Sequence, residues 1–244
     1  MHVQIVRRSL ADSVTEETLD LIVSRGLRPG SPLPSVGELA SLFGVSVIVV
    51  REAMATLAGR GFVTRRQGRE TLVREPDPEV VSSMIRHQIR LDEVTLEELQ
   101  QFRAGLEAQS ASLAAGADLR DTSGLRASLD RLLAASDVVS LRDADLDFHT
   151  ELAKISGNRA LYFMIEALHA VVGDSLETLY ARIIDSGKHA PEYAWSSHAP
   201  IVDAVESGDV NAAVSAMRIH FEYSLPGVDF SVASPGLSAN AGNA

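Results

Sequence analysis

Apolar residues recur every three or four positions along most of this chain, which is the spacing of one buried face on an α-helix. Within residues 77–226 the spacing predicts helices over 79–89, 95–117, 121–136, 141–156, 160–184, 191–206 and 209–225. Gly157-Asn158, Ser186-Gly187 and Ser207-Gly208 interrupt the pattern, as is typical of helix ends. No strand pattern occurs there, so this part is predicted to be an all-helical bundle in which each helix buries one stripe.

The first part of the chain follows a different pattern, of three short helices. An amphipathic segment, 10–24, is followed by a cluster of glycine and proline at 26–34. Ser35 and Ser46 each stand at the N-cap of a short helix, and Gly44 stands at the C-cap of the earlier one. Two short helices joined by a glycine-containing turn are typical of a helix-turn-helix.

A predicted β-hairpin follows the helix-turn-helix and adds a wing. Its strands, 62–66 and 69–73, flank Gln67-Gly68. Two prolines in REPDPE, at 74–79, then interrupt any regular element, and the last residues are small, polar and aperiodic. The mainly α chain is therefore divided into a winged helix-turn-helix over 1–76, a helical domain over 77–226 and a disordered tail over 227–244. A small helical domain without a nucleic-acid role is the alternative for the first part.

Composition excludes several classes of protein. The chain has 244 residues and no cysteine, so it holds neither a disulfide nor a thiolate metal site. It lacks an apolar run of about 18 residues, the length that crosses a bilayer. Its first residues lack the apolar core of a secretory signal. We therefore expect a soluble, cytoplasmic protein with no membrane partner.

Charge is distributed unevenly between the two domains. A formal net charge of −11 argues against nucleic acid as a partner of the whole molecule. Residues 1–76, however, hold ten Lys or Arg against eight Asp or Glu, while residues 77–244 hold 12 against 25. The acidic total thus hides a mildly basic first domain, whose arginines gather at the predicted hairpin.

Four polar side chains fall on apolar stripes of the predicted bundle. They are Asp145, His149, His198 and His220. A single buried histidine is more often a hydrogen-bonded core residue than a metal ligand, and each imidazole could have that structural role. Burying all four without partners would cost several kcal/mol, since each unpaired polar group costs roughly 1 to 3 kcal/mol. One divalent cation would satisfy the whole set, and nitrogen and oxygen ligands without sulfur suit zinc, nickel or manganese. The remaining histidines are assigned to the surface or to ordinary packing.

An arginine interrupts another predicted stripe. Arg103 falls among Leu96, Leu99, Leu106 and Leu113, and Glu107 lies one turn later. One interpretation is an intrahelical ion pair on a solvated flank. The other is an arginine that points into the bundle and binds a carboxylate in bidentate fashion.

Motifs along the chain resemble a known family. PG, LPS, ELA, GVS, VREA and GFV follow one another in the first domain, and FRAGLEAQSASLAA, DLDFHTELAKISGN and AVSAMRIHF in the second. In this order and spacing, over about residues 10–225, they resemble the GntR family of bacterial transcription regulators, with the helical ligand-binding domain of its FadR (FCD) subfamily.

The resemblance implies a ligand and a metal for the helical domain. In the subfamily an Asp, His, His, His set binds a divalent metal, and its positions fall on the same four residues that the stripes selected. A small organic acid completes the coordination. The subfamily's cavity arginine falls on Arg103, and the asparagine of its SGN turn falls on Asn158. Zinc is the expected metal, with nickel or manganese as alternatives.

The resemblance also implies a homodimer that binds a palindromic DNA operator. The expected DNA-binding residues are Ser46, Arg51, Arg65, Arg66, Gly68 and Arg69. Val47 and Ile48 stand where the family usually carries Arg followed by Thr or Ser, and Glu70 replaces a wing glycine. We therefore expect binding through phosphate contacts more than through base edges.

The predicted function is a transcription regulator, with repression as the expected sign, and not an enzyme. Two alternatives are kept open at this point. One is a metal-dependent hydrolase or lyase in which the same four ligands hold a metal that activates water. The other is a relative of the family that has lost DNA binding.

Overall fold

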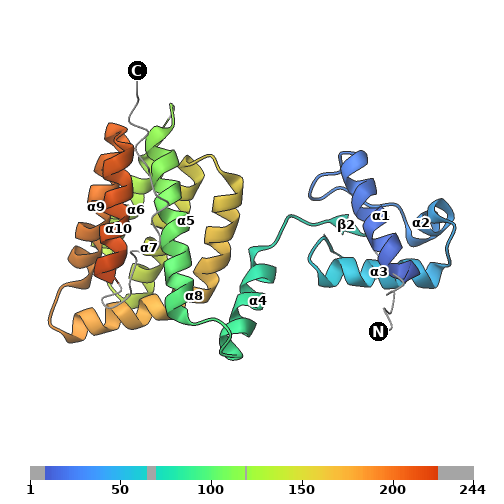
Figure 1. Ribbon diagram of the computed structural model, residues 1–244, viewed down its shortest axis with the longest axis horizontal. Helices are drawn as coiled ribbons and strands as arrows, with labels where there is room; N and C mark the ends of the chain where they lie inside the picture. Colours follow the sequence, from blue (N-terminus) through green and yellow to red (C-terminus); the bar gives the residue numbers. More distant parts are fainter. Residues whose placement is uncertain (1–8, 65–69, 119, 225–244) are drawn as a thin grey trace, which may run out of the picture. The chain divides into compact units, whose positions relative to one another are not determined.

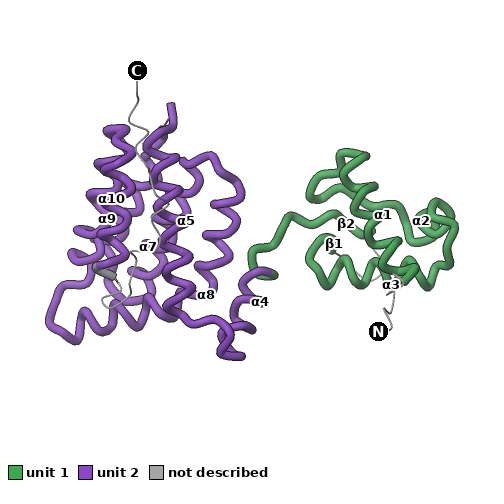
Figure 2. Tube along the Cα trace, in the orientation of Figure 1, with its two compact units in different colours: residues 1–80 green, residues 81–244 purple. Residues whose placement is uncertain are grey.

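The computed structural model describes residues 9–64, 70–118 and 120–224, and these are mainly helical, as the sequence predicts (Figure 1). The chain forms two compact units, residues 1–80 and residues 81–244 (Figure 2). The division lies within α4 (Pro78–Arg90), close to the composition break at 74–79. The predicted disordered tail lies outside the described residues, and the domain limits at 76 and 226 stay predictions.

Three helices build most of the first unit. They are α1 (Leu10–Ser24), α2 (Val36–Phe43) and α3 (Val47–Gly59). A capping box starts α2: the Ser35 hydroxyl accepts the backbone N–H of Glu38, and the Glu38 carboxylate accepts that of Ser35. Gly44 ends α2 at a φ of 66°, a left-handed conformation that suits glycine. The chain bends by 112° between α2 and α3, which is the geometry of a helix-turn-helix.

A short antiparallel hairpin follows α3. β1 (Val63–Thr64) pairs with β2 (Leu72–Val73), and Val63 lies opposite Val73. The core beneath the hairpin lies where α1 packs against α3, and its fully buried side chains include Leu39, Val50, Met54 and Leu57. The turn of the predicted wing, residues 65–69, lies outside the described part of the chain.

The second unit is built from helices alone in its described residues. After α4 come α5 (Leu96–Gly116), α6 (Ser123–Ala134), α7 (Val138–Ile155), α8 (Arg159–Asp185), α9 (Ala190–Ser207) and α10 (Val210–Ser224). α7 begins three residues before the predicted 141, because Asp137 caps it and accepts the backbone N–H of Ser140 at 2.7 Å.

Packing in the second unit gathers four helices around its interior. α5 packs against α10 and α7, and α9 packs against α10. Small side chains at Ala111, Ala114 and Ala115 allow this close approach. The stripe predicted for α5 is partly wrong, because Leu96 is 41% exposed at the helix start. The helix instead buries a face on which small residues alternate with polar ones.

No single helix within the described ranges has both the length and the hydropathy needed to cross a membrane. The bent pair formed by α2 and α3 passes such a test only when its two helices are counted together.

Candidate metal centre

α7 supplies a carboxylate and an imidazole on one buried face. Asp145 and His149 are one turn apart, so their side chains leave the helix on the same side. Phe148 and Leu152 are fully buried beside them and hold this face against the neighbouring helices. The apolar surroundings that bury the face therefore also exclude water from its two polar side chains.

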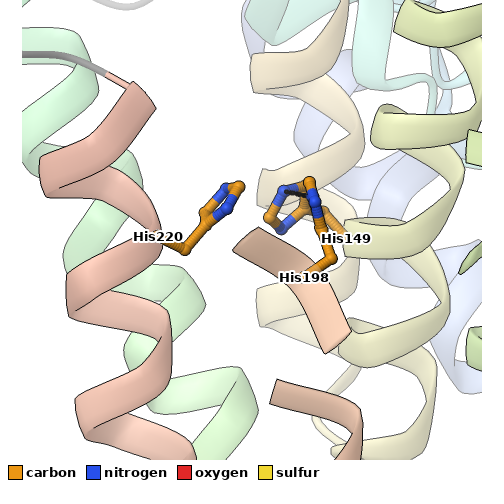
Figure 3. Close-up of side chains that lie close together, drawn as sticks. All are labelled: His149, His198 and His220. Carbon is orange, nitrogen blue, oxygen red and sulfur yellow. Dashed lines mark hydrogen bonds between the residues drawn. The ribbon is translucent and has the colours of Figure 1, made fainter. Parts of the chain in front are cut away.

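Two further imidazoles reach the same place from α9 and α10. The rings of His149, His198 and His220 turn toward one another, and one ligand atom of each lies within 4.8 Å of the other two (Figure 3). The Asp145 carboxylate oxygens lie 3.6 Å from Nε2 of His149 and 3.4 Å from Nε2 of His198. The structure thus brings together the four residues that the sequence singled out.

A backbone carbonyl orients the His198 ring. Nδ1 of His198 lies 2.7 Å from the carbonyl oxygen of Ala194, one turn earlier on α9. A carbonyl oxygen can only accept a hydrogen bond, so Nδ1 carries the proton and Nε2 keeps its lone pair. Burial lowers the pKa of His198 to about 4, so the ring is neutral at pH 7.

A carboxylate on α5 orients the His149 ring. Nδ1 of His149 contacts the Glu107 carboxylate, which also pairs with Nε of Arg103 at 2.5 Å. Burial alone would raise the pKa of Glu107, but the charge of Arg103 and the contact with His149 outweigh burial and lower this pKa to about 2. The ionised carboxylate faces Nδ1 of His149, an arrangement that favours the proton on Nδ1 and leaves Nε2 available as a metal ligand.

These contacts bring together a cluster of nitrogen and oxygen lone pairs, the lone-pair cluster, in the interior of the bundle. Nε2 of His149 and Nε2 of His198 face each other at 3.4 Å, beside the Asp145 carboxylate. Two nitrogens bound to one zinc ion at about 2.1 Å in a tetrahedral arrangement would be separated by about 3.4 Å. A divalent cation therefore fits this donor set in both chemistry and spacing, and zinc, nickel and manganese are all compatible with it.

Tyr180 on α8 supports the Asp145 carboxylate. Its hydroxyl donates a hydrogen bond to Oδ2 of Asp145, and burial together with the Asp145 charge raises the pKa of Tyr180 well above its ordinary value. The phenol therefore stays protonated and remains a donor. On the Asp145 side, burial opposes ionisation but the nearby His198, His149 and Arg103 lower the pKa. Asp145 is thus an anionic ligand candidate held in place from α8.

A small cavity adjoins the cluster. Its volume is about 20 Å³, and its lining residues are Gln100, Arg103, Asp145, Ser175, Leu176, Leu179, His220 and Phe221. Arg103 also lies over the Phe221 ring, 5.3 Å from the ring centroid. A volume of this size holds about one water molecule, so an organic ligand would have to push the surrounding helices apart.

Arg103 combines features of both interpretations drawn from the sequence. It forms the intrahelical pair with Glu107, but the expectation of a solvated flank is wrong, because both side chains are buried. Asn158 does not join the cluster. It is exposed at the start of α8, where its side-chain oxygen accepts the backbone N–H groups of Ala160 and Leu161.

The predicted DNA-binding residues are described only in part. Ser46 caps α3 by accepting the Val49 N–H at 3.4 Å. Arg51 is exposed on α3, as are Val47 and Ile48, with exposed fractions of 39% and 75%. The wing residues Arg65, Arg66, Gly68 and Arg69 lie outside the described residues.

Three residues at or beside the site were not predicted from the sequence to belong to it. The sequence indicated Glu107 only as a possible ion-pair partner of Arg103, one helical turn away. Tyr180 lies on the long helix α8, where a tyrosine beside leucine is ordinary and does not indicate a site. His169, which the sequence assigns to the surface or to ordinary packing, is buried, and its ring centroid lies 6.4 Å from that of His149. Only the packing of α8 against α7 brings these last two residues to the site.

His169 should make the stability of the metal-free protein depend on pH. Burial and then the Arg103 charge lower its pKa from 6.5 to about 3. The imidazole of His169 therefore takes up a proton more readily in the unfolded chain than in the folded one. The free energy of unfolding falls as the pH drops below 6.5. At pH 5 the loss is about 2 kcal/mol. Urea unfolding at pH 7.5 and pH 5, compared between wild type and His169→Leu, measures this contribution. An equal loss in both proteins would contradict it.

Two family models match the chain. The model described as bacterial regulatory proteins, gntR family, matches residues 10–73, and the model described as FCD domain matches residues 98–223. The first match covers the helix-turn-helix and the hairpin, and the second covers the helices that carry the histidine cluster.

Several proteins are similar to this chain over most of its length. The Glc operon transcriptional activator of Escherichia coli K12 is 30% identical, over 88% of this chain and 87% of its own. The HTH-type transcriptional repressor NanR of Cronobacter sakazakii is 29% identical, over 88% and 84%. A solved structure, Streptococcus agalactiae GntR, matches with a TM-score of 0.63 at 25% identity and covers 87% of this chain and 97% of that one.

Proposed function

Because this chain belongs to the gntR family of bacterial regulatory proteins and carries an FCD domain, we propose that it is a metal-dependent, carboxylate-responsive repressor. As a member, it is a DNA-binding transcription regulator and not an enzyme, so the hydrolase alternative is not retained. The proposal adds four things to this: repression as the sign of regulation, a small organic acid as effector, a homodimer on a palindromic operator, and a metal at Asp145, His149, His198 and His220.

The single observation that carries the proposal is the position of the lone-pair cluster. Acceptor atoms from three helices converge next to a cavity that an arginine also lines. A bound divalent cation would supply a fixed positive charge that attracts an effector carboxylate. Arg103 would donate to another oxygen of the same carboxylate while Glu107 keeps the guanidinium in place.

Effector binding would act by opening the bundle. The cavity is too small for an acid in the described conformation, so occupation requires α5, α8 and α10 to separate around it. A change in the second unit that alters operator binding by about 5- to 150-fold corresponds to a coupling of about 1 to 3 kcal/mol. Repression would then be relieved when the acid binds.

The DNA-binding part is tested by the salt dependence of operator binding. Arg51→Ala should weaken binding to a palindromic fragment from the neighbourhood of the gene, because a phosphate contact is lost. The slope of log affinity against log salt should become shallower by about 1 for each such contact, or about 2 for a dimer. Arg90→Ala is the matched control, since it removes the same charge from α4 in the second unit. An unchanged slope in Arg51→Ala would remove this residue from the DNA contact.

The regulatory part is tested in the same assay by adding acids. The zinc-loaded full chain is titrated with short carboxylic acids while it holds the fragment, and release is measured by mobility shift. At least one acid should release the DNA, and the same acid should have no effect after the metal is removed with a chelator. Release that is independent of metal, or binding to no such fragment, would overturn the proposal.

A further inference from the structure

The cavity next to the cluster has a polar wall that metal binding does not use. Gln100 and Arg103 lie one turn apart on α5, so they face the cavity from one side. Both are almost completely buried, with exposed fractions of 2% and 3%. Polar side chains at this depth are normally held by hydrogen bonds.

Each of these two side chains keeps a buried atom without a hydrogen-bond partner among the described residues. The atoms are Oε1 of Gln100 and Nη2 of Arg103. Arg103 otherwise pairs with Glu107 through Nε, and its guanidinium lies over the Phe221 ring. The unpartnered pair consists of a neutral acceptor and a cationic donor, and a matching ligand must therefore offer one donor and one anionic acceptor.

We propose that Gln100 makes the effector site selective for hydroxycarboxylates, acids that bear a hydroxyl group close to the carboxylate. This inference rests on the effector role proposed above. The carboxylate would accept from Nη2 of Arg103, and the hydroxyl would donate to Oε1 of Gln100. An acid without the hydroxyl would bury Oε1 with no partner, and this penalty is the source of the selectivity.

Charge and size narrow the ligand class further. An ammonium group could also donate to Gln100, but it would then lie beside the Arg103 cation in a site of low dielectric, which is unfavourable. Because any acid requires the helices around this cavity of about 20 Å³ to separate, an acid of a few carbons needs a smaller opening than a sugar acid or a fatty acid. Leu176 and Leu179 on α8 would contact the carbon atoms of such a ligand.

The test compares acids that differ only in the hydroxyl group. Glycolate against acetate, and lactate against propionate, are titrated calorimetrically into the zinc-loaded full chain. The hydroxy acid of each pair should bind at least about tenfold more tightly. In Gln100→Met, which has a similar volume and no acceptor of this strength, the two acids of each pair should bind with similar affinity. Gln101→Met, one position along α5 and outside the cavity lining, should keep the wild-type preference.

The possible outcomes distinguish a failure of the proposed role of Gln100 from a failure of effector binding itself. Equal affinities within each pair in the wild type, or a preference that persists in Gln100→Met, would overturn the role of Gln100 alone. Binding of none of the four acids would overturn the effector role itself. If Gln100→Met fails to fold by circular dichroism, Gln100→Leu replaces it, and the wild-type comparison stands without either variant.

Discussion

Replacing His198 by alanine is expected to lower zinc affinity by at least about 100-fold, because changes that merely misorient a metal ligand already cost about 10- to 100-fold. His198 is fully buried, and its Nε2 faces both His149 and Asp145. The loss should appear as a fall in metal content to near zero by elemental analysis of the purified protein. Thermal unfolding provides a second measurement. Zinc at about 100 times its Kd should raise the free energy of unfolding of the wild type by about 2.7 kcal/mol, and this increment should vanish in the variant.

His87→Ala is the matched control for this prediction. His87 is exposed on α4, so its removal should leave both the metal content and the thermal increment unchanged. A wild-type protein that contains no metal after growth and dialysis in zinc, or a His198→Ala protein that keeps it, would contradict the metal centre.

Replacing Glu107 by leucine should lower the free energy of unfolding of the metal-free protein by about 3 to 5 kcal/mol. The substitution leaves Arg103 buried with no counter-ion on its own helix, and it also removes the carboxylate that orients His149. Urea unfolding at pH 7.5 measures the change. Glu97→Gln, at an exposed site in the first turn of α5, should change stability by less than about 1 kcal/mol.

A double variant separates the ion pair from the packing around it. Arg103→Met combined with Glu107→Leu removes both charges and keeps similar volume, so much of the lost stability should return. If Glu107→Leu lowers the free energy of unfolding no more than Glu97→Gln does, the Arg103–Glu107 pair is not a buried electrostatic unit. If the double variant is as unstable as the single one, the loss arises from packing.

The helices of this protein were largely predictable because residues near their ends make capping interactions within a few positions of the sequence. Ser35 and Thr95 each accept a backbone N–H at a helix start, and Gly44 supplies a left-handed end. These are interactions within a few residues, which a sequence pattern expresses directly. The stripe on α5 was less predictable. A leucine near a helix end can lie in solvent, as Leu96 does, while alanine and serine take the buried positions.

The site was predictable only where its residues broke a pattern. Asp145, His149, His198 and His220 stood out because each is polar on an apolar stripe. Gln100 and Tyr180 did not stand out, since a glutamine among glutamates and a tyrosine among leucines are ordinary on a helix. Their importance arises from contacts between helices far apart in sequence. Tyr180 reaches Asp145 across 35 positions of the chain, and no local spacing encodes that distance.

The depth of the histidine cluster has a consequence for how fast this protein can respond to metal. All four candidate ligands are buried, and α10, which carries His220, is the last helix of the described chain. An ion can enter or leave only when a helix moves away from the bundle, so exchange follows the rate of local opening and not the rate of diffusion. The residence time of the metal should then be long compared with that of the acid. The ion would work as a permanent part of the fold, acquired when the chain folds, while the acid carries the changing signal.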